Sequence, residues 1–344
     1  MKPQTAVFRL VVMAVLFGVP VRGLLADLVI VENGEARAAV YVAARVMEDG
    51  NSPEPGHVWG VQDAEGNRRR LRESVKDLVF YVEKMSGARL DVVGGVPQPG
   101  DARIPILIGE VAAERFGPPE THAVLGQGFR MVVGPNGVGL IGESDLGTSY
   151  AIYELLHRLG CRWYMPSEMG EVVPERKIVA LAETDFSFAP YTLYRGIWYC
   201  DNDYARRNRM GGLLLNAGHA LELSYLSKEQ LQEHPQWIAT VDGKPNPYRL
   251  KWSAPGLAEA IADTIVARLD KEPTTLSVSL SPDDGLGFDN SPEDRALDAG
   301  DWDPVFGEVS ITDRLIWFCN RVAGRVTQKY PDVLFGLLAY VNYN

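Results

Sequence analysis

Short apolar runs alternate with stretches of helical periodicity between residues 27 and 187. Residues 28–31 and 104–109 are two apolar runs of strand length. Between them, apolar side chains recur at helical spacing at Leu71, Val75, Leu78, Val79, Val82 and Met85. Gly87 follows and is suited to end a helix. The pattern predicts a mixed α/β layer domain of modest size, in which helices cover a sheet.

A hairpin and a helix complete this predicted domain. Residues 129–133 and 138–141 are apolar runs joined by the turn sequence GPNG, which predicts a hairpin. One helical face then carries Ala151, Ile152, Leu155, Leu156 and Leu159, with Gly160 as the stop. An aromatic-rich strand is expected at residues 161–164, where Trp163 and Tyr164 need cover from a neighbouring element.

The rhythm changes after residues 186–190, because Pro190 interrupts local structure. Runs of strand length then recur at residues 193–199, 213–217, 248–252, 275–281 and 333–340. Helical patterns lie among them at residues 228–238, 257–269 and 311–326. The repeating strand–helix order predicts a TIM-type (β/α) barrel. We therefore expect an accessory α/β domain over residues 27–187, followed by a barrel domain over residues 191–344.

The predicted barrel is short of strands. A closed barrel of this type needs eight strands, and the sequence pattern predicts about five. We therefore expect a barrel that is truncated after about five strands. The alternative is a half-barrel or a smaller α/β sheet that is complete in itself, although an open strand edge would favour aggregation.

The N-terminal residues have the layout of a secretory signal peptide. Two basic residues flank the start of an apolar run at residues 10–19, and small residues follow at Gly23 and Ala26. The run is too short to anchor the chain across a bilayer, and Asp27 stands where a bacterial lipoprotein signal would need cysteine. We expect residues 1–26 to be cleaved, the protein to be periplasmic or extracellular, and no membrane or lipid anchor to remain.

Charge and cysteine content narrow the range of partners. The 45 acidic and 34 basic side chains give a net charge of −11, which repels phosphate backbones and argues against nucleic acid. A neutral ligand, or a charged ligand that is recognised by a local group of residues, is easier to reconcile with this net charge. Cys161, Cys200 and Cys319 are odd in number and widely spaced, so they form neither a disulfide framework nor a metal-ligand cluster. One pair could still bridge in an oxidising compartment.

Candidate catalytic carboxylates follow the fourth predicted barrel strand in the sequence SPDDG. Active sites of barrels lie at the C-terminal strand ends, where repulsion and partial burial can raise the pKa of Asp283 or Asp284. Glycoside hydrolysis generally uses two carboxyl groups, but sequence neighbours at a strand end point in different directions. Only one of the two is therefore expected to be the general acid. The alternative is a turn pair, because Asp before Gly is ordinary turn chemistry.

Other strand ends carry side chains that suit a sugar ligand. They are Arg195, Trp198 and Tyr199 after the first strand, Asn216 and His219 after the second, and Tyr340 and Asn342 after the fifth. An aromatic ring can stack on a sugar face, while amide, imidazole and guanidinium groups bind hydroxyls. Core packing is the alternative for Trp198, and a structural hydrogen bond is the alternative for His219. Because no second His or Cys lies at ligand spacing from His219, no zinc site is expected.

Two charged clusters have simpler explanations than a ligand site. The loop at residues 285–309 carries Asp289, Asp294, Asp298, Asp301 and Asp303. It lacks the ligand order of an EF-hand, so we expect a solvated acidic loop rather than a calcium site. Arg206, Arg207 and Arg209 could meet an acidic sugar, but a solvated helix face is the preferred interpretation.

Several of these strings resemble known families. GTSYAIYELLHRLGCRWYMPSEMGEVVP, at residues 147–174, resembles the end of the N-terminal domain before the catalytic barrel in family 67 alpha-glucuronidases and in the domain-of-unknown-function family 4838 (DUF4838). Further strings resemble family 4838 in the same order: RRNRMGG, GHA, EHPQWIATVDGKP, SVSLSPDDG and KYPDVLFGLLAYVNY. Asp284 falls at the family's strand-end Asp, and His219 falls at its His. The chain departs from compared members at FDNSPED and LKWS, where those members carry cysteines.

The resemblance implies carbohydrate chemistry. It suggests an exported glycoside hydrolase acting on a polysaccharide or glycan, with alpha-glucuronidase-like specificity as one version. Asp284 would protonate the leaving oxygen, Asp283 would tune its pKa, and no metal or organic cofactor would be required. Related alpha-glucuronidases place their remaining carboxylates on later strands, so the second catalytic group has no counterpart in these strings. The competing hypothesis is a non-catalytic glycan-binding protein that keeps the aromatic and polar side chains at the strand ends but lacks a working pair of catalytic carboxylates.

Overall fold

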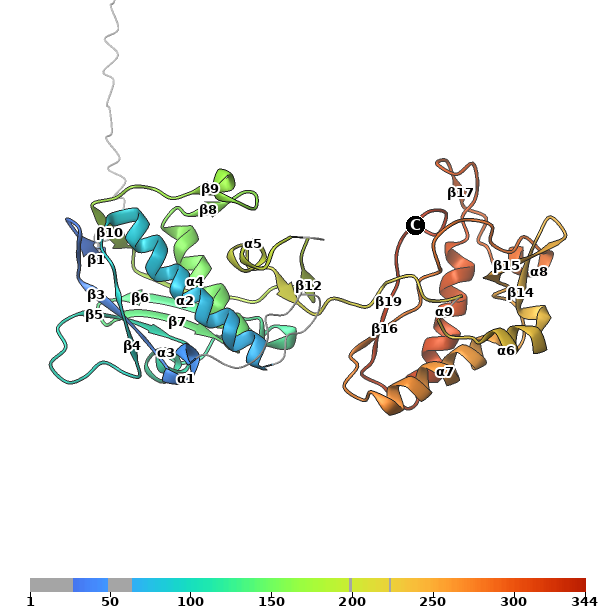
Figure 1. Cartoon of the computed structure of the whole chain (residues 1–344), viewed down its shortest axis with the longest axis horizontal. Helices are drawn as coiled ribbons and strands as arrows, with labels where there is room; N and C mark the ends of the chain where they lie inside the picture. The colour runs from blue at the N-terminus through green and yellow to red at the C-terminus, as the bar shows by residue number, and fades with distance from the viewer. Residues whose placement is uncertain (1–26, 49–63, 198–199, 223) are drawn as a thin grey trace, which may run out of the picture. The chain divides into compact units, whose positions relative to one another are not determined.

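The computed structural model describes residues 27–48, 64–197, 200–222 and 224–344. The expected signal peptide and Trp198, together with Tyr199, lie outside these ranges. The described chain divides into two compact units. Unit 1 holds the described residues up to 191 together with 197 and 200–210, and unit 2 holds residues 192–196 and those from 211 to 344. In Figure 1 the colour runs from blue to yellow-green through unit 1 and from yellow to red through unit 2.

Unit 1 is built on a six-stranded mixed sheet. In spatial order its strands are β11 (Thr184–Phe188), β6 (Phe129–Gly134), β7 (Gly137–Gly142), β5 (Ile104–Ile108), β3 (Ala38–Val42) and β4 (Asp91–Gly94). The last four run parallel, whereas β6 is antiparallel to both of its neighbours. A smaller sheet joins β10 (Ile178–Leu181), β1 (Leu28–Glu32) and β2 (Glu35–Ala36). The two predicted strands and the predicted hairpin are confirmed as β1, β5 and β6–β7.

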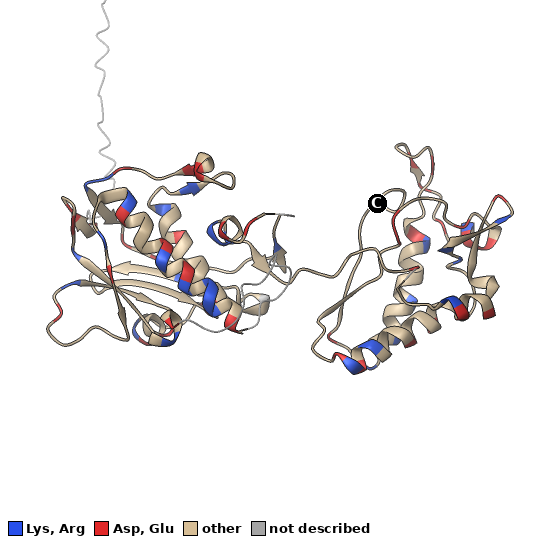
Figure 2. Ribbon diagram, viewed as in Figure 1, with Lys and Arg blue, Asp and Glu red and all other residues tan. Residues whose placement is uncertain are grey.

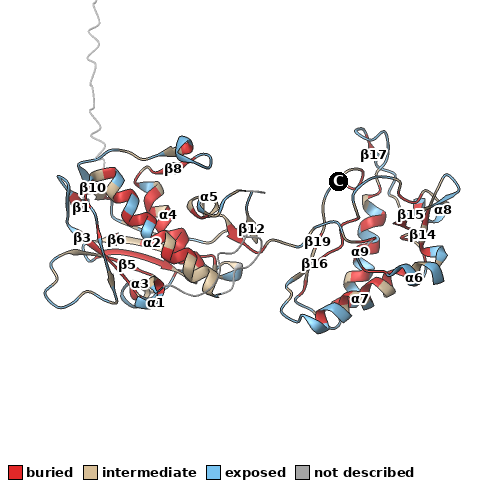
Figure 3. Cartoon of the chain, viewed as in Figure 1, coloured by how far each residue is buried: buried red, intermediate tan, exposed pale blue. Residues whose placement is uncertain are grey.

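Helices cover both faces of the larger sheet (Figures 1 and 3). On one face, α2 (Ala64–Ser86) and α4 (Asp145–Arg158) share a core with alternate strand residues such as Val40 and Ile106. The intervening residues, such as Tyr41 and Leu107, belong to a second cluster with α3 (Glu110–Phe116). The two-residue period of the strands therefore supplies two apolar layers. The mixed α/β layering and the two helices expected from the sequence are confirmed.

Short elements complete unit 1. They are α1 (Ala44–Met47), η1 (Val124–Gly126), β8 (Arg162–Trp163), η2 (Glu168–Gly170), β9 (Glu171–Val172) and α5 (Asn202–Arg207). The aromatic-rich strand expected at residues 161–164 is confirmed as β8. Its Trp163 is covered edge-on by Tyr81 of α2 and Tyr153 of α4, with ring centroids 5.0 and 5.8 Å away.

The arginines of α5 point inward rather than into solvent. Arg206 is 7% exposed, and its Nη2 donates to Asp77 Oδ2 of α2 at 3.1 Å. Arg207 Nε donates to the same oxygen at 3.1 Å, and Arg209 pairs with Glu154 of α4. The expected solvated helix face is therefore wrong, because both long helices present carboxylates to these arginines. Figure 2 shows the charged positions along α2.

Unit 2 is centred on α7 (Leu257–Lys271) and α9 (Thr312–Val326), whose apolar faces share one core. Beside them, β16 (Ser277–Ser279) and β19 (Leu334–Gly336) form a parallel pair. The other elements are β12 (Tyr194–Arg195), β13 (Gly211–Gly212), α6 (Lys228–Glu233), η3 (Pro235–Trp237), β14 (Ile238–Val241), β15 (Lys244–Leu250), α8 (Pro292–Arg295), β17 (Trp302–Asp303) and β18 (Glu308–Val309). The helices predicted at residues 257–269 and 311–326 are confirmed.

No closed barrel is found among the described residues of unit 2. Apart from β16–β19, the described strands of this unit pair as antiparallel two-stranded ribbons, and residues 213–217 are irregular. Asp242 and Gly243 have φ values of 51° and 74°, so they form a two-residue turn that joins β14 directly to β15. A hairpin returns the chain at once, whereas parallel barrel strands need a crossover.

The acidic loop at residues 285–309 is not solvated along its length. Asp289, Asp294 and Asp303 are 2%, 1% and 6% exposed. Each accepts a backbone N–H, from Thr240, Ser253 and Val305 respectively, at 2.6, 2.9 and 2.8 Å. The expectation of a solvated loop is wrong because these carboxylates satisfy main-chain donors, and Asp289 and Asp294 fasten the loop to residues outside it.

The cysteines in the described chain are free thiols: Cys161 and Cys319 are buried, and Cys200 is half-buried. None of the described helices is both long and apolar enough to span a bilayer.

Candidate functional site

The C-terminal end of β16 leads into residues 281–285, which we call the SPDDG turn. Val278 and Leu280 anchor the strand in the core of unit 2. Residues 217–221 run beside the strand end, where Leu221 N–H donates to the Ser281 carbonyl at 3.0 Å. Gly285 has a φ of 102°, which lets the chain reverse directly after the two aspartates.

Two buried charged side chains hold the SPDDG turn from inside. Glu222 Oε2 accepts the backbone N–H of Asp283 at 2.6 Å. Arg249 Nη2 donates to the carbonyls of Asp284 and Gly285 at 2.9 and 2.5 Å. Glu222 is 3% exposed and Arg249 is 2% exposed, with 3.9 Å between Oε2 and Nη1. The turn is thus fixed from beneath, while the Asp284 side chain stays exposed and accepts the N–H of Gly285 at 2.9 Å.

His219 and Tyr340 adjoin the same turn. His219 Nδ1 donates to the Pro282 carbonyl at 2.6 Å, so the structural hydrogen bond considered for this residue is present. The His219 and Tyr340 rings lie 5.8 Å apart between centroids, tilted by 55°. Tyr340 keeps 42% of its surface exposed, which leaves an aromatic surface beside His219. The strand-end reasoning therefore placed His219 at the turn that carries Asp283 and Asp284, with Tyr340 next to it, even though the barrel is not found.

Glu222 has the most perturbed carboxyl group at this turn. Burial raises its pKa from 4.5 to about 7, against the opposing effects of the Asp283 N–H and the Arg249 guanidinium. Its Oε1 has no hydrogen-bond partner, and neither has the buried hydroxyl of Tyr343. Burial, reinforced by the nearby Glu222 charge, raises the pKa of Tyr343 to about 12. A carboxyl group that holds its proton near neutral pH can act as a general acid.

The other predicted sugar contacts take different places. Arg195 lies in β12 opposite Gly211 of β13. Asn216 is exposed, and its backbone N–H donates to Ser277 Oγ at 2.8 Å. Asn342 is buried and lines a separate pocket of unit 2. Throughout the described ranges, no three His, Cys, Asp or Glu side chains gather as a metal site would require.

Sequence patterning missed both Glu222 and Arg249. Glu222 lies in the apolar string GHALELSYL, and a single charge within such a run is the signal that could have identified it. Arg249 gave no comparable signal, because it lies in the polar string NPYRLK. Its role depends on the β14–β15 hairpin, which the barrel prediction did not include.

The ionisation of Glu222 is expected to make the stability of unit 2 depend on pH. Because folding raises its pKa from 4.5 to about 7, the folded state holds the proton more tightly than the unfolded chain. The stabilisation is fully present below pH 4.5 and is lost as the pH rises through 7, a change of about 3 kcal/mol. The loss of stability is measured by hydrogen exchange of α9 amides, compared between wild type and Glu222→Gln from about pH 5 to about pH 8. Equal pH dependence in the two proteins would contradict the assignment.

Comparison with known proteins identifies a family and distantly similar solved structures. The model of the family Domain of unknown function (DUF4838) matches residues 165–344. A solved family GH115 4-O-methyl-alpha-glucuronidase with specificity for decorated arabinogalactans resembles the chain at 12% identity and a TM-score of 0.43. The match covers 92% of this chain and 43% of the glucuronidase chain, so this chain spans less than half of that protein. No curated protein sequence matches.

The family match covers the parts of the chain on which the candidate site is built. It includes β16, the SPDDG turn and β19, and it extends over more than half of the sequence. The expected resemblance to family 4838 is confirmed, whereas the resemblance of residues 147–174 to family 67 alpha-glucuronidases stays a prediction. The chain belongs to the family Domain of unknown function (DUF4838).

Proposed function

We propose that unit 2 hydrolyses glycosidic bonds of a polysaccharide or glycan at the SPDDG turn. The observation that carries the proposal is the position of Glu222, a buried carboxyl group with one unpartnered oxygen, directly beneath the turn that presents Asp284. Two carboxyl groups in unlike environments are what this reaction requires, since one must hold a proton while the other carries charge. The resemblance of residues 147–174 to glucuronidase sequences supports the choice of a glycosidic bond.

We assign the proton to Glu222 rather than to Asp284, which the sequence favoured. The pKa of Glu222 is raised to about 7, so the group is largely protonated in mildly acidic solution and about half protonated at neutral pH. Asp284 is exposed on a turn that is held by Arg249 and Glu222, which suits the carboxylate that stabilises positive charge on the sugar. Because Glu222 Oε1 is enclosed, its proton reaches the leaving oxygen through one water or after a shift of the turn.

Substrate recognition and location follow from the same features. Tyr340 offers an exposed aromatic face, and His219 is held beside it. The net charge of −11 favours a neutral chain or one whose acidic groups are recognised locally. Glucuronic acid removal is one specificity within this proposal. The signal-like N-terminus supports export, which would bring the protein to extracellular or periplasmic glycans.

A pH–rate profile tests the function. Wild-type protein, incubated with plant and algal polysaccharides, is expected to release reducing sugar with kcat/KM on a plateau in mildly acidic solution and at half the plateau value near pH 7. Above pH 7 the value should fall about tenfold per pH unit, because Glu222 loses its proton. Reducing-end labelling and chromatography measure the release. Absence of hydrolysis across the panel contradicts the proposal and favours the non-catalytic glycan-binding alternative.

A further inference from the structure

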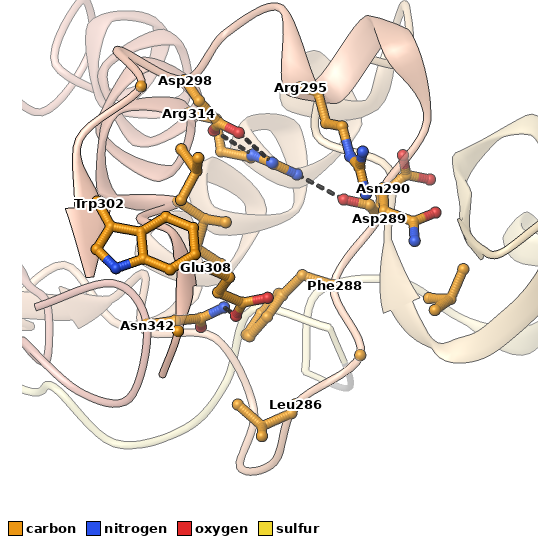
Figure 4. A pocket seen from close by; sticks show the side chains of 16 residues that line it. Leu286, Phe288, Asp289, Asn290, Arg295, Asp298, Trp302, Glu308, Arg314 and Asn342 are labelled. Carbon is orange, nitrogen blue, oxygen red and sulfur yellow. Dashed lines mark hydrogen bonds and ion pairs between the residues drawn. The ribbon is translucent and has the colours of Figure 1, made fainter. Parts of the chain in front are cut away.

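We infer that a second site in unit 2, apart from the SPDDG turn, binds a neutral sugar unit. The site is a pocket of about 590 Å³, formed by the loop after the turn, the β17–β18 ribbon and Asn342. Its volume lies within the range of about 300–1,000 Å³ that small-molecule sites occupy. Figure 4 shows Trp302, Glu308, Asn342 and Phe288 together on one side, with Arg295, Asp289 and Asn290 on the other.

The pocket has an aromatic platform on a fixed support. Trp302 is 65% exposed although it is the largest apolar side chain of the lining. It pairs with Val309 across the β17–β18 ribbon, and the Asp303 carboxylate accepts the backbone N–H groups of Val305 and Phe306 at 2.8 and 3.2 Å. The backbone that carries the exposed ring is therefore fixed by local structure, and an exposed planar ring at a pocket is suited to stacking on the apolar face of a pyranose.

The polar groups beside the platform accept hydrogen bonds. Asn342 is 4% exposed, and its Oδ1 has no partner, while its Nδ2 donates to Glu308 Oε1 at 2.6 Å. The Glu308 carboxylate thus offers an exposed acceptor next to Trp302, whereas the Asn342 oxygen is an unpaired acceptor enclosed in the pocket wall. Sugar hydroxyls are donors that match them, whereas an anionic ligand would be repelled by Glu308.

The buried cation of the lining does not favour an acidic ligand. Arg314 is 3% exposed and binds both carboxylate oxygens of Asp298. Its Nη1 donates to the Asp289 carbonyl at 2.5 Å. Its charge is therefore neutralised within the protein. Arg295 is exposed on the opposite side from Glu308, so a uronate could approach it from solvent, and the experiment includes this case.

The pocket is close in sequence to the proposed catalytic turn. Leu286 and Phe288 of the lining follow Asp284 by two and four residues. Arg249, which braces the turn, also lies 4.6 Å from the centroid of the Phe288 ring. The role of the pocket as a subsite for the same glycan rests on the proposed function, whereas its ability to bind a neutral sugar does not.

Calorimetry with the full chain tests this inference. The probes are xylopentaose, cellopentaose and galactopentaose as neutral ligands, and pentagalacturonate as the acidic one. Asp284→Asn serves as the background, so that the ligand is not cleaved. In this background Trp302→Ala is expected to raise the Kd of at least one neutral pentasaccharide by about tenfold or more. The matched control is Trp317→Ala, which removes a partly exposed Trp of α9 outside the pocket and should leave the Kd unchanged.

The outcomes separate the two proposals. Binding of no neutral probe, an unchanged Kd in Trp302→Ala, or tighter binding of pentagalacturonate would each overturn the inference. Binding that depends on Trp302, in a protein whose wild type hydrolyses none of the glycans, keeps the sugar site and overturns the proposed hydrolysis. Hydrolysis by the wild type, together with a Kd that Trp302→Ala leaves unchanged, keeps the proposed hydrolysis and overturns the sugar site.

Discussion

Glu222→Gln is expected to lower the hydrolysis of natural glycans by about 10²- to 10⁴-fold, the contribution typical of a general acid. Glutamine keeps the size of the side chain and, through its amide oxygen, can still accept the Asp283 N–H. It has no proton to transfer at this position. The SPDDG turn should therefore persist while the leaving oxygen departs without protonation. Initial rates of sugar release from the best natural substrate measure the loss.

A comparison of leaving groups separates proton donation from bracing of the turn. A 2,4-dinitrophenyl glycoside of the released sugar carries a leaving group that departs as the phenolate without a proton. Glu222→Gln should therefore cleave it nearly as fast as wild type. Equal losses on the natural and the activated substrate would show that Glu222 only positions the turn. Glu229→Gln, at an exposed glutamate of α6, is the matched control and should change neither rate.

Asp77→Ala is expected to destabilise unit 1 by about 3–5 kcal/mol, because it leaves Arg206 and Arg207 without their buried counter-ion. Asp77 Oδ2 accepts hydrogen bonds from the Tyr153 hydroxyl at 2.7 Å and from Arg206 and Arg207 at 3.1 Å each. Alanine removes both carboxylate oxygens and frees four donors, since Arg207 Nη2 also donates to Oδ1 at 3.3 Å. The greatest effect should be at α5, since its charged side chains turn towards Asp77.

Asp203→Ala is the matched control for this prediction. Asp203 pairs with the same two arginines, at 2.8 and 3.8 Å, but its side chain is 56% exposed. An exposed pair of this kind contributes at most about 1 kcal/mol. Hydrogen exchange of α4 and α5 amides reports on unit 1 without contribution from unit 2. Similar losses of protection in Asp77→Ala and Asp203→Ala would mean that burial does not determine the strength of this cluster.

Local patterns predicted much of unit 1 and little of the pairing in unit 2. The apolar positions of α2 and α4 recur at helical spacing, and the GPNG turn specifies the β6–β7 hairpin. Each of these elements could therefore be predicted from its own residues. The strand β3 was missed, although it is buried throughout, because its run AAVYV is short and its small residues gave a weak apolar signal. Its place between β5 and β4 depends on partners distant in the sequence.

The direction of strand pairing was the main error in unit 2. An apolar run of strand length looks the same whether its neighbour is parallel or antiparallel. Asp242 and Gly243 carried the missing information, since Asp-Gly between two such runs is a strong hairpin signal. The strand-end search nevertheless selected Asp283 and Asp284, because β16 ends shortly before them at Ser279, whereas the search reached His219 through residues 213–217, which form no strand.

Glu222 and the buried aspartates of the acidic loop share a reason for being missed. Charge in a sequence suggests solvent, and only the fold reveals that a carboxylate has been enclosed and how many backbone N–H donors it meets there. Asp294, at 1% exposed, and Glu222, at 3%, are indistinguishable from surface acids by type. Their different roles follow from the number of donors that the chain brings to each.

The assignment of residues 200–210 to unit 1 has a consequence for how the protein is made. They follow residues 192–196, which belong to unit 2, and precede Gly211, where unit 2 resumes. During synthesis unit 1 therefore lacks the arginines that neutralise Asp77 until residue 210 has left the ribosome, by which time the first piece of unit 2 has already emerged. Because the segments of the two units alternate along the chain, no single cleavage of the polypeptide can release either unit intact.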